Sequence, residues 1–444
     1  MDGRSVVVAV ICWLITFLTG TSVRSLGLVY VTFLARFNWT REQGVWPMCV
    51  VTALLNLGGL VHTILKPRLS CTTIALLAST GHVFGILSAY YVDTVLSMVL
   101  TFGIFTGLGA GAVFITVGAF IKDYFDDGAQ KVVQNANVIA FCVAGCVFPK
   151  TLLTVRFAYG YEGFILAGGA LVSAVPVLCI LLKLCSGKRV PQEQQALSSV
   201  NTITASIELP VVAAGKPARL GYASIFRSPM FYLIAVPYVI FTYTLTMFMC
   251  TLIDVAFDKG LTPTYAITII PIYSVIEIIG RVVVPCVLPT EQNRRVIFMV
   301  SYMVIGSILL LVPLTYNYVT LLFTCLSLAV FNGSVIALHS VLVADYVNKD
   351  LQHSANIFIN ILTSSSFLSK PFIAGFLRDD MGTYTPLHQI LGSLVLLSGV
   401  AWALTNCGRI TSRRDTWKKD KPKLEQFHEC ADVSLVSYQL LYGY

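Results

Sequence analysis

Five charged side chains lie well inside long apolar stretches of this sequence: Arg24, Lys150, Glu277, Arg281 and Lys370. A charge at the centre of a membrane helix costs about 2.5 to 3.5 kcal/mol on insertion scales, so such a residue usually has a function. Four of the five are cations, and a buried cation needs an anion to compensate it. The set predicts a path for a small organic anion, with Arg24, Arg281, Lys150 and Lys370 as substrate-binding residues.

Glu277 and Arg281 have the most informative spacing. Residues four positions apart lie on one face of a helix, so these two side chains can form an ion pair. An arginine fork also binds a substrate carboxylate through two parallel hydrogen bonds. Glu277 is the only carboxylate well inside an apolar stretch, which makes it the expected proton-coupling residue. A purely structural ion pair is the alternative.

The two lysines lie at a depth that is compatible with two roles. Lys150 and Lys370 are each about 12 Å from the outer end of their stretch, at 1.5 Å per helical residue. A lysine at this depth is near the limit of snorkelling, in which the ammonium reaches the membrane surface. Substrate binding and snorkelling therefore both stay open. Asp254 and Asp345 lie near the ends of their stretches, and we expect them to be ordinary solvated residues.

The composition identifies the elements that carry these charges. Of the 444 residues, 56% are hydrophobic and only 12% are charged, and the mean hydropathy is +0.78. Soluble domains carry about 25% charged residues, so the surface of this chain has too few charges to face water. A soluble enzyme and a disordered chain are both excluded, and an all-α membrane protein remains.

A bilayer core about 30 Å thick requires roughly 20 apolar residues per helix. Twelve stretches meet this requirement, at residues 6–33, 44–64, 71–91, 95–121, 132–156, 160–184, 228–256, 262–289, 296–314, 318–344, 353–377 and 385–406. Their length and lack of alternation favour twelve transmembrane helices over the strands of a membrane barrel.

One long polar segment divides the chain. Residues 186–227 read as a flexible cytoplasmic linker between an N-terminal six-helix half, 1–185, and a C-terminal six-helix half, 228–406. Residues 407–444 form a charged tail. Two six-helix halves joined by a cytoplasmic loop are typical of the major-facilitator fold, in which the halves rock around a site at the membrane midplane.

The distribution of positive charge predicts orientation and excludes other classes of protein. Most Lys and Arg residues in the loops fall on the side of both termini, so both termini are expected in the cytoplasm. The net charge of +8 therefore belongs to a membrane surface, and no nucleic-acid partner is expected. No Ser/His/Asp set, metal-ligand cluster or phosphate loop is found, so we expect neither an enzyme nor a cofactor or metal.

Several segments resemble the monocarboxylate transporter family. The segment KPFIAGFLRDDMGTY, 370–384, resembles the family's eleventh-helix signature PPxAGxxxDxxGxY. IEIIGR, 276–281, resembles the eighth-helix Asp-x-x-x-Arg pair, with Glu277 in place of Asp. The resemblance implies alternating-access transport of monocarboxylates such as lactate or pyruvate, with proton symport, at the plasma membrane. It also implies a single-span ancillary glycoprotein as a partner of the kind that some relatives use.

One departure bears on the mechanism. Proton-coupled relatives have a lysine in the first helix that takes up a proton, and the matching position in this chain is Arg24. An arginine keeps its proton in a protein, so it holds a carboxylate but exchanges no proton. Proton coupling would then depend on Glu277. The alternatives are a proton-independent facilitator of aromatic amino acids or larger amphipathic anions, and a non-transporting sensor on the same scaffold.

Overall fold

Long helices account for the regular structure of the described chain. A computed structural model describes residues 3–186, 226–287, 291–347 and 349–416, and within these ranges every regular element is a helix. Eleven helices in this part of the chain are long and apolar enough to cross a membrane. One of them, Gly128–Ser186, has 59 residues and contains two of the predicted spans. The all-α membrane fold expected from the composition is confirmed.

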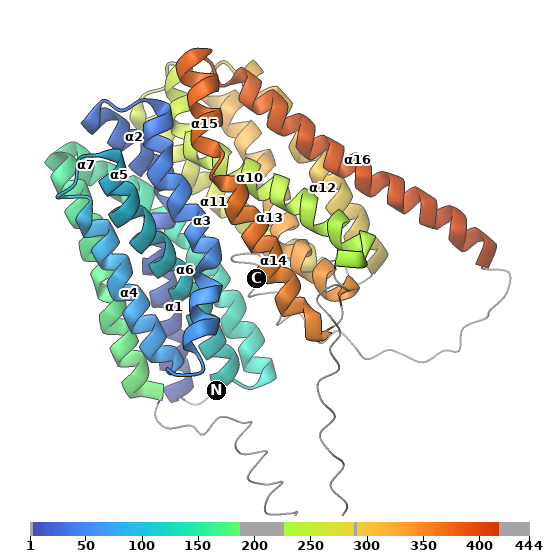
Figure 1. The fold of residues 1–444 in the computed structure, drawn as a ribbon, viewed down its shortest axis with the longest axis horizontal. Coiled ribbons are helices and arrows are strands. Elements are labelled where there is room, and N and C mark those ends of the chain that lie inside the picture. The colour runs from blue at the N-terminus through green and yellow to red at the C-terminus, as the bar shows by residue number, and fades with distance from the viewer. Residues whose placement is uncertain (1–2, 187–225, 288–290, 348, 417–444) are drawn as a thin grey trace, which may run out of the picture.

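The N-terminal half contains the first six predicted spans (Figure 1). Its elements are α1 Gly3–Arg24, α2 Leu26–Phe37, α3 Arg41–Leu65, α4 Cys71–Ser88, α5 Val95–Met98, the π-helix η1 Val99–Gly103, α6 Ile104–Tyr124 and α7 Asp127–Ser186. The long helix α7 bends at Gly160, where φ is 69°. A positive φ is readily adopted only by glycine, so this residue allows the fifth span to turn back as the sixth.

The C-terminal half contains the last six spans. Its elements are α10 Pro229–Asp258, α11 Pro263–Val287, α12 Glu291–Leu311, the 3₁₀ helix η2 Val312–Leu314, α13 Tyr318–Tyr346, α14 Lys349–Phe367, α15 Lys370–Gly375, the π-helix η3 Phe376–Asp380 and α16 Thr385–Thr416. Helix α16 extends into the predicted tail. The remainder of that tail, 417–444, and most of the predicted linker, 187–225, lie outside the described residues.

Two spans are broken at a charged residue. The first span consists of α1, which ends at Arg24, and α2, which begins at Leu26. The eleventh consists of α14, which ends at Phe367, and α15, which begins at Lys370. Pro371 lies in the first turn of α15, where its missing N–H is tolerated. In membrane proteins such breaks occur where the backbone lines a cavity rather than lipid.

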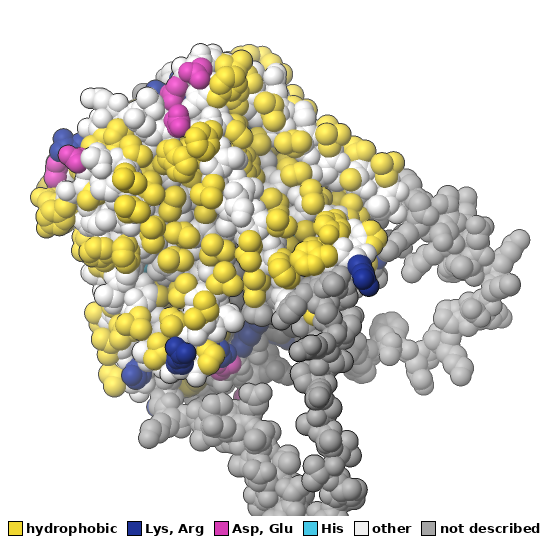
Figure 2. All heavy atoms as spheres, in the orientation of Figure 1, with side chains coloured by type: hydrophobic (Ala, Val, Ile, Leu, Met, Phe, Trp, Pro, Cys, Tyr) yellow, Lys and Arg dark blue, Asp and Glu magenta, His cyan; other side chains and the backbone are white. Residues whose placement is uncertain are grey.

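The surface distribution of side chains fits a lipid environment. Hydrophobic side chains cover most of the face shown in Figure 2, and the charged side chains gather toward its two ends. Large apolar residues such as Leu77, Phe84 and Leu397 are more than half exposed. A soluble protein rarely exposes so much contiguous apolar surface, so this face packs against the lipid bilayer.

Candidate functional site

A cavity of about 200 Å³ lies between the two halves. Helices α1, α2, α3 and α7 of the N-terminal half line it, together with α10, α11, α13, α14 and α15 of the C-terminal half. Four charged residues belong to this lining: Arg24, Glu277, Arg281 and Lys370. Four of the five intramembrane charges predicted to form a site therefore share one cavity.

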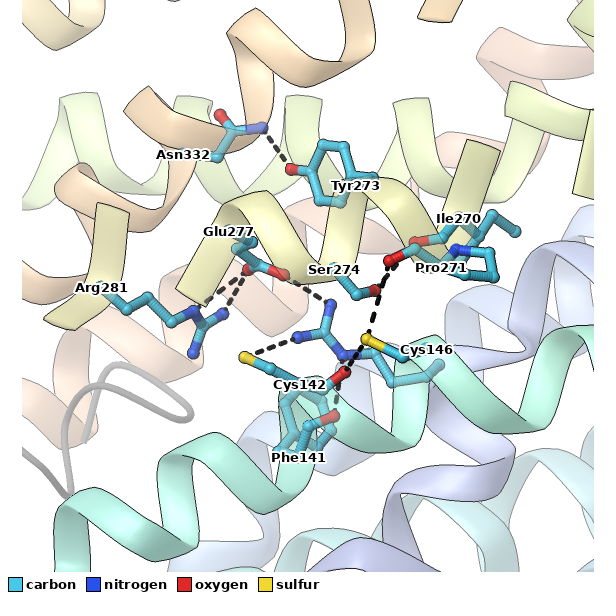
Figure 3. Close-up of polar contacts among 11 residues, drawn as sticks. Phe141, Cys142, Cys146, Ile270, Pro271, Tyr273, Ser274, Glu277, Arg281 and Asn332 are labelled. Atoms are coloured by element: carbon cyan, nitrogen blue, oxygen red, sulfur yellow. Dashed lines mark hydrogen bonds and ion pairs between the residues drawn. The ribbon is translucent and has the colours of Figure 1, made fainter. Parts of the chain in front are cut away.

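Glu277 joins the two arginines. Its Oε1 lies 2.6 Å from Nη2 of Arg281, the pair labelled in Figure 3. Its Oε2 lies 2.8 Å from Nη1 of Arg24. The pair with Arg281 is the one expected from the four-residue spacing on α11. The pair with Arg24 connects different halves of the molecule, because Arg24 ends α1. One carboxylate thus holds a cation from each half.

Contacts with α7 hold Arg24 in place. Its Nε donates a hydrogen bond of 3.3 Å to the carbonyl oxygen of Phe141, and its Nη2 lies 3.4 Å from Sγ of Cys142. The guanidinium carbon lies 4.3 Å from the centre of the Phe141 ring. Gly145 provides space, since a Cβ at this position would lie 3.3 Å from Cδ of Arg24 and would overlap Ser274.

The three charges are withdrawn from solvent to different degrees. The side chains of Glu277 and Arg281 are 2% and 4% exposed, whereas that of Arg24 is 13% exposed. Removing one partner from a buried ion pair costs about 3 to 5 kcal/mol, because the other charge stays uncompensated. On this basis, releasing Glu277 from either arginine requires compensation of the charges that are left. A proton can neutralise the Glu277 carboxylate, and a second carboxylate can take its place at the arginine.

Lys370 has a different environment in the same cavity. The residue is 2% exposed, and its ammonium donates a hydrogen bond to Oγ1 of Thr246. The ammonium nitrogen lies 3.3 Å from the centre of the Phe367 ring and 5.2 Å from that of Tyr243. Among the described residues, no carboxylate lies within 4.0 Å of it.

Lys150 lies apart from the other four charges. It is exposed, whereas its neighbours Phe148 and Pro149 on α7 are buried, and it does not belong to the cavity lining. The rotation of α7 directs this lysine away from the cavity, a position that agrees with the snorkelling alternative. Its expected role in substrate binding therefore finds no support in the geometry.

The sequence did not indicate a polar cluster at one end of the molecule. Asp254 on α10 is 4% exposed and accepts a hydrogen bond of 2.7 Å from the hydroxyl of Tyr384. It also lies 3.3 Å from Nε of Arg41, at the start of α3. The hydroxyl of Tyr384 lies 3.4 Å from that of Tyr30 on α2. The expectation that Asp254 is solvated is wrong, because this end of α10 packs against the other half.

Asp379 adds a second connection at this end. Its carboxylate oxygens accept hydrogen bonds from the backbone N–H groups of Arg41 and Glu42, each 3.1 Å long. A carboxylate of the C-terminal half therefore caps the first turn of α3 in the N-terminal half. We call this end, with Asp254, Asp379 and their partners, the outer end, because the charge distribution predicts that it faces outside.

Comparisons with known proteins agree with this architecture. A family model described as the Major Facilitator Superfamily matches residues 12–371. Monocarboxylate transporter 12 of Rattus norvegicus is 23% identical over 411 residues, which cover 88% of this chain and 82% of the relative. Monocarboxylate transporter 2 of the same species is 22% identical over 379 residues, which cover 83% of this chain and 76% of the relative. The resemblance expected from the signature segments is confirmed.

Solved structures show the same fold at lower identity. A peptide transporter crystallised with sulfate has a TM-score of 0.69 at 12% identity, covering 90% of this chain and 94% of its own. A D-xylose-proton symporter has a TM-score of 0.62, also at 12% identity, and the match covers 89% of this chain and 96% of the symporter. Proteins that carry peptides and sugars share this fold, so the choice of substrate depends on the residues that line the cavity.

Proposed function

Because the chain belongs to the Major Facilitator Superfamily, we propose that it is a secondary transporter that moves small carboxylate-bearing anions, such as lactate and pyruvate, across the plasma membrane. Both termini face the cytoplasm in this proposal. In folds of this kind the two halves rock around a site near the midplane and expose it to each side in turn. The cavity between the halves, with its arginines, is the proposed binding site.

The observation that carries the proposal is the position of the Glu277 carboxylate between two guanidinium groups. It lies 2.8 Å from Arg24 of one half and 2.6 Å from Arg281 of the other. A substrate carboxylate has the same charge and the same hydrogen-bonding oxygens as Glu277. It can therefore take the place of Glu277 at either arginine and be held by both halves during the rocking movement.

Glu277 is the proposed proton-coupling residue. A proton on its carboxylate removes the negative charge that both arginines share, and leaves them available for a substrate anion. Proton and anion then bind together, which is the requirement for symport. Arg24 has no part in proton exchange, because an arginine keeps its charge.

A second candidate is a proton-independent facilitator of aromatic amino acids or larger amphipathic anions. The lining of the cavity favours it, because Phe141, Tyr238, Tyr273 and Phe367 provide aromatic surface next to the cations. Aromatic rings contribute apolar contact area and stack against other rings. In this candidate Glu277 keeps its charge throughout the cycle.

Uptake into oocytes separates these candidates. Labelled lactate, pyruvate and an aromatic amino acid are offered at two external pH values to cells that express the chain. We expect monocarboxylate uptake to rise at the lower pH, because more external protons reach Glu277. Arg281→Ala should abolish uptake, and Glu277→Gln should remove its dependence on pH.

Lys150→Ala is the matched control, since it removes a cation that is exposed and outside the cavity lining. Its uptake should equal that of the unchanged chain. Unaltered uptake in Arg281→Ala at equal surface expression would overturn the proposed site. If uptake by the unchanged chain does not depend on external pH, proton symport is excluded and the proton-independent facilitator is the remaining candidate.

An ancillary single-span glycoprotein is part of the proposal through the resemblance to monocarboxylate transporters. The broad apolar surface in Figure 2 offers room for a transmembrane helix of such a partner. The corresponding test compares the surface expression of the chain alone with its surface expression together with candidate single-span glycoproteins.

A further inference from the structure

The cavity contains two separate positive centres. Arg24 and Arg281 share the carboxylate of Glu277, so this cluster has a net charge of +1. Lys370 lines the same cavity, and no carboxylate of the described residues lies within 4.0 Å of its ammonium. Three cations and one carboxylate give the lining a net charge of +2.

The neutral contacts of Lys370 compensate its burial only in part. The hydroxyl of Thr246 accepts one hydrogen bond, although an ammonium group has three donors. The rings of Phe367 and Tyr243 contribute cation–π attraction, which is about 0.5 to 2 kcal/mol. Taking an ion out of water still costs several kcal/mol in a protein. The difference favours a bound anion at this ammonium.

Snorkelling does not account for this lysine. A snorkelling side chain keeps its ammonium in water, but Lys370 is 2% exposed. The exposed Lys150 shows the contrasting arrangement. The break before α15 places Lys370 at the cavity wall, so its charge faces a ligand space rather than the membrane surface.

Apolar side chains line other parts of the same cavity. Met48 on α3 and Leu245 and Met249 on α10 belong to the lining. With Glu277 ionised, a single carboxylate in the cavity leaves an excess of one positive charge, whereas a ligand with two acidic groups leaves none. With a proton on Glu277 the excess is two and one, so the second acidic group lowers the uncompensated charge in either state. Such a ligand would place its charged ends at the two centres and its carbon chain against the apolar wall.

We propose that Lys370 binds a second acidic group of the substrate, so that this transporter prefers dicarboxylic acids with a short apolar spacer over monocarboxylic acids of the same length. The inference rests on the proposed function, because the first acidic group binds at Arg24 and Arg281. It makes Lys370 the residue that determines specificity between one and two acidic groups.

Matched acids test this preference. The purified full-length chain is titrated at neutral pH with butyrate and succinate, and with hexanoate and adipate, and thermal stabilisation reports binding. Uptake of the same acids is measured in proteoliposomes. We expect the dicarboxylate of at least one pair to bind about tenfold more tightly, which corresponds to about 1.4 kcal/mol.

The decisive quantity is the ratio of the two affinities within a pair. Lys370→Met should lower this ratio about tenfold, and Lys370→Arg should keep it, because arginine retains the charge. Arg281→Ala should weaken both acids and leave the ratio of the pair nearly unchanged. Lys150→Met controls for the loss of a positive charge elsewhere. Lys370→Gln replaces the Met variant if that variant does not fold.

Two outcomes overturn the inference. One is an unchanged chain that binds the monocarboxylate of every pair as tightly as the dicarboxylate. The other is a folded Lys370→Met variant with an unaltered ratio. In either case, binding of monocarboxylates that depends on Arg281 would leave the proposed function intact. Absence of binding and uptake for all four acids would overturn both proposals.

Discussion

The two ends of the molecule use their polar residues differently. At the outer end, Asp254 contacts Arg41 and Asp379 contacts the first turn of α3, so carboxylates of one half bind the other half. At the opposite end, which we call the inner end, Lys66 pairs with Asp123 within the N-terminal half, and Arg294 pairs with Asp345 within the C-terminal half. The helices of the two halves also diverge toward this end (Figure 1).

This difference assigns a state to the structure. Contacts between the halves at either end must break when the halves rock around the midplane, whereas pairs within one half can persist through the whole cycle. The outer end is therefore closed here by contacts that belong to this state alone. The inner pairs stiffen each half without selecting a state. Substitutions at the two ends should consequently have unequal effects on the balance between states.

Asp254→Ala should have the largest effect on that balance. The variant loses the carboxylate that accepts hydrogen bonds from Arg41 of the other half and from Tyr384 of its own half. Only the contact with Arg41 joins the halves, and a hydrogen bond to a charged group contributes about 2 kcal/mol. We expect a shift of roughly 30-fold toward the state that is open outside. Cys49 and Cys250 line the cavity, so their labelling by an impermeant maleimide from outside should increase.

Asp123→Ala is the control for this change, since it removes a carboxylate from the inner end. Labelling equal to that of the unchanged chain is expected there. A similar increase in both variants would show that the two ends do not differ as the structure indicates.

Asp379→Ala should shift the balance in the same direction by a smaller amount. The variant loses two hydrogen bonds to backbone N–H groups at the start of α3, and a helix cap of this kind contributes about 1 kcal/mol. We expect a shift of roughly fivefold, measured by the same labelling. Asp379→Asn retains an acceptor oxygen, so its labelling should stay close to that of the unchanged chain. Labelling of Asp379→Asn as high as that of Asp379→Ala would argue against the capping contact.

Lys66→Ala should have the smallest effect. Its ion pair with Asp123 is about half exposed on both sides, and exposed pairs contribute about 0 to 1 kcal/mol. Both members also belong to the same half. Because the pair persists in both states, its loss should not shift the balance between them, and we expect labelling from outside to equal that of the unchanged chain. A clear change would indicate that the inner end selects a state as well.

The sequence predicted the local part of the site and missed its tertiary part. Glu277 and Arg281 were predicted as a pair because a helix brings residues four positions apart together. The contact of Glu277 with Arg24 depends on how the halves dock, and no spacing along the chain indicates it. Lys150 and Lys370 have the same predicted depth, but the rotation of their helices separates an exposed lysine from one in the cavity.

Burial at the outer end was missed for a related reason. Asp254 lies near the end of an apolar stretch, where a residue normally meets water. The end of α10 instead packs against α3 and the loop that carries Tyr384. Hydropathy records depth along the membrane normal and contains no information about which helix faces the partner half. The twelve spans were predictable because each requires only length and apolar composition.

The breaks beside Arg24 and Lys370 have a mechanical consequence. A continuous helix resists bending because each turn is bonded to the next, whereas a broken span can hinge at the break with little loss of backbone hydrogen bonding. Arg24 and Lys370 lie beside these breaks, so we expect the first and eleventh spans to bend there more readily than elsewhere. An anion bound at either charge would then act on its span at the point of least resistance to bending.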